Sequence, residues 1–171
     1  MRIIGIDPGI NKTGYGIIDY HANNFKTVEY GCIVPLNSTT FQEKMLSICK
    51  QVEKILIAHN PNIAVVEDIF YAVNPQTALK LGHIRGALMM TISNQNIALA
   101  ELTPLEIKKG MTGYGRAEKN QVAEMVRIVL GLAETPVPSD TTDALAAAIV
   151  YAIKGDFNRA VSEQILKKNK N

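Results

Sequence analysis

The chain has 171 residues, of which 47% are hydrophobic, so it can form one good core but is too short for two ordinary domains. Its formal net charge is only +2, and any affinity for nucleic acid must therefore come from local clusters of cationic side chains. No run approaches the roughly 18 apolar residues of a membrane span, and Met1-Arg2 leads into a predicted strand rather than a signal peptide. We therefore expect a cytoplasmic protein without a membrane partner.

The N-terminal part of the chain predicts an antiparallel meander of three strands. The β-branched run from Ile3 to Ile6 is typical of a central strand that is covered on both faces, and it ends at Asp7. A Pro-Gly pair then turns the chain. Strands over residues 13–20 and 25–34 follow. One face of the first of these carries two glycines, which allow another backbone to pack closely there: Gly14 and Gly16.

The later elements are predicted from apolar periodicity, helix caps and breaking residues. They are a helix (40–59), a strand (62–67), a helix (75–94), a strand (96–102), a short helix (104–108), a helix that includes Val122 to Leu130, and a last helix (139–154). The order βββαβαβ followed by helices predicts an α/β fold, with a mixed five-stranded sheet and helices on both of its faces.

Glycines set two of the predicted helix ends. Gly110 is expected to end the short helix before it, and Gly155 is expected to end the last helix. The chain would then consist of a single domain over residues 1–155 and a partly disordered tail over residues 156–171. The helix over 75–94 also carries a four-residue ladder of small residues, which fits close packing either on the protein's own sheet or on another helix: Ala78, Gly82 and Gly86.

Two strands that should be buried each end in a carboxylate, Asp7 and Glu67. Residues at the carboxyl ends of strands in an open sheet line a common crevice, and a buried carboxylate needs a cation or several donors. Asp140 and Asp143 stand three residues apart in the last helix, so they share a face. Helix capping alone would account for Asp140, whereas Asp143 precedes a run of Ala and Ile that should be buried. Asp68 would point to the opposite face of its strand and is not counted as a ligand.

Four acids that converge on one point repel one another unless cations neutralise them. A ligand set made only of oxygens suits Mg²⁺ or Mn²⁺, and the lack of nearby His or Cys argues against zinc. Two such ions about 4 Å apart can activate a water and stabilise the leaving oxygen of a phosphodiester. The acids therefore indicate a metal site suited to phosphodiester chemistry.

Five motifs in order, spread from Met1 to about Lys154, resemble the RuvC family of Holliday-junction resolvases. They are Gly5-Ile-Asp-Pro-Gly9 with Thr13-Gly-Tyr-Gly16, Val66-Glu67 with Phe70, Ala78-Leu-Lys-Leu-Gly82 with Arg85-Gly86, Ala117-Glu-Lys119, and Asp140-x-x-Asp143-Ala-Leu-Ala. The resemblance implies a ribonuclease-H-like fold and a homodimer with two active sites, each with two Mg²⁺ ions that Mn²⁺ can replace. Such an enzyme nicks a four-way DNA junction symmetrically in homologous recombination and DNA repair, alongside branch-migration proteins.

The family pattern also assigns roles to individual residues. The catalytic and metal-binding quartet would be Asp7, Glu67, Asp140 and Asp143. Phe70 would stack against a junction base, and two lysines would face the DNA near the cleaved phosphate, Lys108 and Lys119. Aromatic and cationic residues near the motifs give further predicted DNA contacts: Tyr71, Lys80, Arg85 and Arg116.

Other interpretations are left open. The segment Gly-Ile-Asp-x-Gly followed by a glycine hairpin also resembles the first phosphate loop of actin-like ATPases, but 171 residues leave no room for the second lobe that such enzymes close over a nucleotide. A ribonuclease-H-like relative could instead cleave structured RNA, or bind junctions without cleaving them. The intact quartet argues against lost catalysis.

Overall fold

The computed structural model describes residues 1–36, 40–68, 74–132 and 137–168. Its elements are β1 (Arg2–Asp7), β2 (Thr13–His21), β3 (Asn24–Ile33), α1 (Phe41–His59), β4 (Ile63–Glu67), α2 (Pro75–Asn94), β5 (Ala98–Leu102), α3 (Pro104–Thr112), α4 (Lys119–Leu130) and α5 (Ser139–Lys168). The predicted order βββαβαβ followed by helices is confirmed. None of the described helices has the length and apolar character needed to span a membrane.

The strands form one mixed five-stranded sheet in the order β3-β2-β1-β4-β5. β1 pairs antiparallel with β2 and parallel with β4, and β4 pairs parallel with β5. The β2–β3 hairpin turns at Ala22 and Asn23, whose φ values of 47° and 64° suit a tight hairpin turn. The two strands that end in carboxylates, β1 and β4, are therefore parallel neighbours, and both end at the same edge of the sheet.

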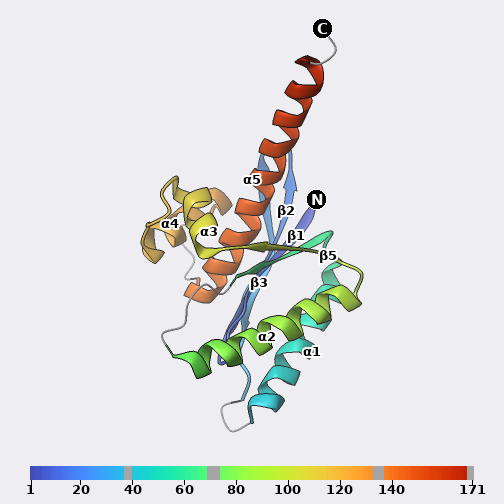
Figure 1. Cartoon of the computed structure of the whole chain (residues 1–171), viewed down its shortest axis with the longest axis vertical. Coiled ribbons are helices and arrows are strands. Elements are labelled where there is room, and N and C mark those ends of the chain that lie inside the picture. The colour runs from blue at the N-terminus through green and yellow to red at the C-terminus, as the bar shows by residue number, and fades with distance from the viewer. Residues whose placement is uncertain (37–39, 69–73, 133–136, 169–171) are drawn as a thin grey trace.

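Helices cover both faces of the sheet, as predicted (Figure 1). α1 and α2 pack on the face that carries Ile4 and Val66. α5, with α3 and α4 beside it, packs on the opposite face, which carries Ile3 and Val65. Because side chains alternate along a strand, the last residue of β1 and the last residue of β4 both face α5.

Glycines on β1 and β2 allow α5 to lie against the backbone of the sheet. A Cβ atom at Gly5 would overlap the carbonyl oxygen of Ala144, and a Cβ atom at Gly14 would overlap that of Asp140. Gly14 pairs with Asp7 across the two strands. The close approach therefore sets the start of α5 beside the end of β1, and the predicted packing on the glycine face is confirmed.

Both helix ends predicted from glycines are wrong. Gly110 lies inside α3, where a Cβ atom would meet the Val150 side chain of α5, and the helix ends instead at Gly113, whose φ of 76° is left-handed. α5 passes through Gly155 and continues to Lys168, so most of the predicted tail is helical. One glycine in a helix costs only about 1 kcal/mol relative to alanine, and no proline comes after it to stop the helix. The division into a domain and a tail stays a prediction.

The small-residue ladder of α2 points away from the sheet. The buried residues of this helix are Ile84, Leu88 and Ile92, on the side opposite to Gly82 and Gly86. A Cβ atom at either glycine would meet nothing within 4 Å in the described part of the chain. Packing on another helix is therefore the alternative that the structure favours.

Replacing Gly5 by alanine should destabilise the protein, because the added methyl group would overlap the backbone of α5 at Ala144. We expect the free energy of unfolding, measured by urea titration, to fall by about 1–3 kcal/mol. Gly155→Ala is the matched control: its site is helical and open, so alanine should raise the free energy of unfolding by about 0.5–1 kcal/mol. Effects of equal sign and size would contradict the close packing of α5 on β1.

Candidate active site

The ends of β1 and β4 place two carboxylates on the same face of the sheet. Asp7 is the last residue of β1 and Glu67 the last residue of β4, and the two strands are hydrogen-bonded neighbours. The turn after Asp7 is held by Thr13, whose buried hydroxyl donates to Gly9 O at 2.9 Å and accepts from the Gly9 N–H at 3.3 Å. Asp7 is thus fixed by a strand before it and a hydrogen-bonded turn after it.

The start of α5 brings two more carboxylates to this edge of the sheet. Asp7, Glu67 and Asp143 line one cleft of about 240 Å³. Two lysines line the same cleft, Lys108 and Lys119, and its remaining walls are side chains of α3 and α4: Pro104, Ile107 and Val122. Asp140 is not part of the lining, although its charge helps to raise the pKa of Asp7. The structure therefore gathers three of the four predicted acids in one cleft and keeps the fourth nearby.

Burial and mutual repulsion make this cleft costly for negative charge. Burial raises the pKa of Asp7 to about 8, and the charges of Glu67, Asp143 and Asp140 add to the shift. Burial likewise raises the pKa of Glu67 to about 7, with Asp143 as the next contributor. The neighbouring Asp7 side chain and the charges of Lys119 and Lys108 offset part of the rise in the Glu67 pKa. Both carboxyls therefore tend to keep protons near neutral pH unless a cation takes their place.

Lys119 is a cation that the protein itself supplies to the cleft. Its Nζ, at the start of α4, donates to Asp143 Oδ2 at 3.0 Å, and its charge lowers the pKa of Asp7 and of Glu67. In the described ranges, no three His, Cys, Asp or Glu side chains are close enough together to hold a metal ion in this arrangement. The atoms around the cleft that could bind a metal ion are nevertheless all carboxylate oxygens. Their chemistry fits a hard divalent cation that displaces Lys119 and the protons.

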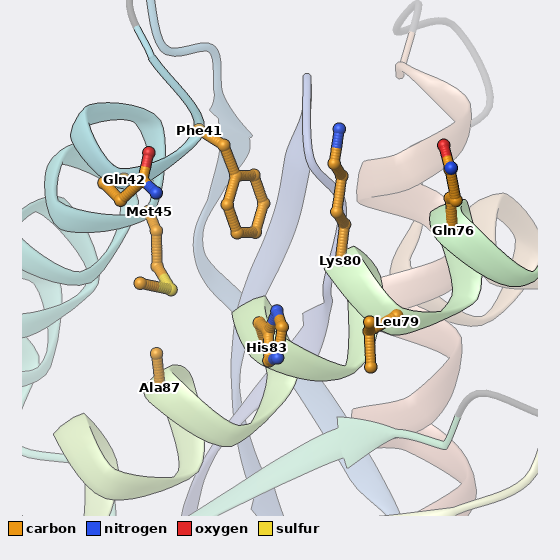
Figure 2. A pocket seen from close by; sticks show the side chains of 8 residues that line it. All are labelled: Phe41, Gln42, Met45, Gln76, Leu79, Lys80, His83 and Ala87. Carbon is orange, nitrogen blue, oxygen red and sulfur yellow. The ribbon is translucent and has the colours of Figure 1, made fainter.

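The predicted DNA contacts lie in different parts of the molecule. Lys108 reaches the cleft from α3, and Arg116 is exposed just before α4. Lys80 lies on α2, on the other side of the sheet, with its Nζ 5.9 Å from the centre of the Phe41 ring. Both side chains line a groove of about 620 Å³ between α1 and α2, and Figure 2 shows how they lie there. Phe70 and Tyr71 lie outside the described residues.

Arg85, also predicted to contact DNA, is mostly buried and is engaged with Asp68, Glu101 and the backbone of Glu67. Asp68 does not line the cleft, and its exclusion as a ligand stays a prediction. Sequence reasoning missed this cluster because its members lie on three different elements. The only local signal was the position of Arg85 next to Ile84, at the inward side of α2.

A scan against known families matches residues 3–151 to the model described as crossover junction endodeoxyribonuclease RuvC. The chain belongs to the RuvC family. It is 41% identical over 157 residues to the RuvC of Alkaliphilus oremlandii (strain OhILAs), and this alignment covers 92% of the chain and 96% of the relative.

Solved structures confirm the ribonuclease-H-like RuvC fold. The structure of T. thermophilus RuvC in complex with Holliday junction substrate matches with a TM-score of 0.86 at 30% identity, covering 92% of this chain and 96% of that one. The yeast mitochondrial Holliday junction resolvase matches with a TM-score of 0.68 at 13% identity, covering 95% of this chain and 83% of that one. At such low identity the second match shows a shared fold alone.

The metal-free protein should lose stability as the pH rises from about 4 to about 8. In this interval the native state keeps protons on Asp7 and Glu67 that the unfolded chain, with ordinary pKa values of 3.8 and 4.5, has already released. Asp7→Asn removes one of these groups. It should therefore raise the free energy of unfolding near pH 8 by about 1–3 kcal/mol and flatten the pH dependence. Urea titrations with a chelator near pH 5 and near pH 8 measure both effects.

For Asp19→Asn we expect a change of opposite sign in the free energy of unfolding. A hydrogen bond from Arg2 lowers the pKa of Asp19, so neutralising this carboxylate should destabilise the protein at both pH values. If Asp7→Asn were instead no more stable than the unaltered protein near pH 8, a cost of charging the buried Asp7 carboxyl beside the other acids would be contradicted.

Proposed function

We propose that this RuvC-family protein is a metal-dependent endonuclease that resolves four-way DNA junctions by paired, symmetric nicks. The observation that carries the proposal is the cleft in which Asp7, Glu67 and Asp143 meet, with Asp140 nearby. These acids stand in the motifs that resemble the family, and the relatives that the chain matches over almost its full length are named crossover junction endodeoxyribonucleases. A cleft in which carboxylates can bind divalent cations and two lysines lie beside them suits hydrolysis of a phosphodiester.

The four acids Asp7, Glu67, Asp140 and Asp143 would hold Mg²⁺, or Mn²⁺ in its place, with two ions per site. When bound, these ions supply an activated water and a stabilised leaving oxygen. The protein would contribute metal-binding carboxylates that are fixed on two strand ends and one helix. Little reorganisation would then be needed when negative charge develops on the reacting phosphate. The apolar walls from α3 and α4 limit the water around the reacting phosphate.

Lys108 and Lys119 would bind the phosphate that is cleaved. The Lys119 side chain is 73% exposed, so its ion pair with Asp143 is weak and easily exchanged. A cation that binds at Asp143 would release Lys119 to a phosphate oxygen. Lys108 approaches the same cleft from α3, and the two lysines would then hold the DNA backbone between two different helices.

A homodimer would supply the two cleavage sites that paired nicks require. The outer face of α2 supports it: Leu79 and Met90 are 64% and 62% exposed and lie on the same side of the helix as Gly82 and Gly86. Figure 2 shows Leu79 beside the apolar groove that α2 forms with α1. Small residues allow two helix backbones to approach closely, so this face fits the same face of a second copy across a twofold axis. Branch-migration proteins stay predicted partners.

Purified protein should nick a labelled four-way junction in the presence of Mg²⁺ and leave a linear duplex and a structured RNA intact. Asp7→Asn should abolish nicking with little change in junction affinity, because it removes a metal ligand and not the DNA-contacting surface. Glu124→Gln, at an exposed acid of α4, is the matched control and should cleave normally. Cleavage of RNA alone, or loss of junction binding in Asp7→Asn, would argue against this function.

Charges placed on the outer face of α2 should separate the dimer. The double substitution Leu79→Lys and Met90→Lys would bury two ammonium groups at the proposed interface, so light scattering after size exclusion should show a monomer where the unaltered protein is a dimer. Ile128→Lys, at a residue of α4 that is 61% exposed, is the control and should stay dimeric. A double variant that keeps its dimer mass would place the interface elsewhere.

A further inference from the structure

Arg85 joins three points at the ends of β4 and β5. Its Nη2 lies 3.2 Å from Asp68 Oδ1 and also pairs with Glu101 Oε2. Its Nε donates a long hydrogen bond of 3.4 Å to the backbone carbonyl of Glu67. The Arg85 side chain is 17% exposed, whereas those of Asp68 and Glu101 are 40% and 46% exposed. The guanidinium is therefore the buried centre of the cluster.

The cluster lies on the side of the sheet away from the cleft. Val66 belongs to the face that α1 and α2 cover, and Glu101 is its partner on β5. Asp68, two residues after Val66, reaches the same side. Glu67 alternates to the other face and lines the cleft. Arg85 thus contacts the backbone carbonyl of Glu67, from the face of the sheet opposite to the Glu67 carboxylate.

The charges around Arg85 make it a poor ligand for a DNA phosphate. One guanidinium faces two carboxylates, so the cluster has no positive charge to spare for DNA. To reach a phosphate, the arginine would have to give up its contacts with both carboxylates and with the Glu67 carbonyl. The planar fork of arginine, on the other hand, can serve several acceptors at once, which a lysine ammonium does less well.

We propose that Arg85 is a positioning residue that holds the end of β4 so that the Glu67 carboxylate stays directed into the cleft. The Asp68 N–H donates to Leu102 O at 2.8 Å and fixes the same point to β5, so the backbone at Glu67 is held from two sides. Because Glu67 is a metal ligand in the proposed function, on which this role rests, a loosened Glu67 weakens metal binding and slows cleavage without weakening the hold on DNA.

The test compares Arg85→Lys and Arg85→Ala with Lys54→Ala, which removes an exposed cation of α1 outside the cluster. Arg85→Lys keeps a charge between Asp68 and Glu101, so it should stay folded, as thermal melting can verify. Three quantities are measured: the single-turnover cleavage rate at saturating junction, the junction affinity at several salt concentrations, and the Mg²⁺ concentration that gives half of the metal-induced rise in melting temperature without DNA.

We expect both Arg85 variants to cleave about 10–100-fold more slowly and to need about tenfold more Mg²⁺ for the melting shift, with Arg85→Ala the more affected. Junction affinity and its salt dependence should match those of the unaltered protein, and Lys54→Ala should keep the normal cleavage rate. A normal cleavage rate in Arg85→Ala, with affinity reduced and a salt slope smaller by about one phosphate contact, would overturn the positioning role.

Failure of the proposed function would look different. The unaltered protein would then leave junctions uncut, while the melting shift with Mg²⁺ would still report whether Arg85 supports metal binding. A melting shift unchanged in both Arg85 variants would overturn the positioning role whatever the nuclease assay shows.

Discussion

Repulsion among carboxylates held at one edge of the sheet is the constraint on which the rest of the structure depends. Asp7 and Glu67 end adjacent strands, and Asp143 reaches them from α5, so a negative charge on one of them makes a charge on the others more costly. Burial, and after it this repulsion, raises the pKa of Asp7 and of Glu67, and the charge of Lys119 offsets part of the rise. Stability alone would not select such an arrangement. It is consistent with a site that is completed by divalent cations.

The backbone geometry that creates this repulsion comes from residues without side chains. Gly5 and Gly14 remove the Cβ atoms that would hold α5 away from β1 and β2. Without that close approach, the first turn of α5 would lie farther from Asp7, and Asp143 could not line the same cleft as Glu67. The glycines therefore act on the electrostatics of the cleft through helix placement, although none of them carries a functional group.

The features that could be predicted from the sequence are those that depend on a local pattern. The alternation of strand residues and the two strands that end in acids were enough to predict the sheet and the meeting of Asp7 and Glu67 at one edge. The three-residue spacing of Asp140 and Asp143 brings Asp143 into the same cleft, whereas Asp140 does not line it. The ends predicted at His59 and Asn94 are confirmed, but those assigned to Gly110 and Gly155 are not, because both glycines are tolerated inside helices. Gly113 instead takes the left-handed conformation that ends α3. Whether a glycine ends a helix depends on the side chains that pack against it and on the residues that come after it in the chain.

Arg85 shows why a cation near a motif is weak evidence for a DNA contact. Its sequence position fits a phosphate ligand as well as an internal ion pair, and only the tertiary fold places Asp68 and Glu101 against it. The inner and outer sides of α2 make different contacts. The inner side supports the backbone of Glu67 through Arg85, and the outer side, with Gly82 and Gly86, is the surface proposed for the second copy.

The helix α2 lies between the proposed dimer interface and β4, the strand that ends in Glu67. If two copies meet along α2, the interface and the Arg85 contacts are separated only by the width of one helix, so the spacing of the two Glu67 side chains is set by packing and not by loops. Paired nicks on a symmetric junction require two sites at a fixed separation. A helix that contacts its partner on one side and supports the metal-site strand on the other would provide that separation.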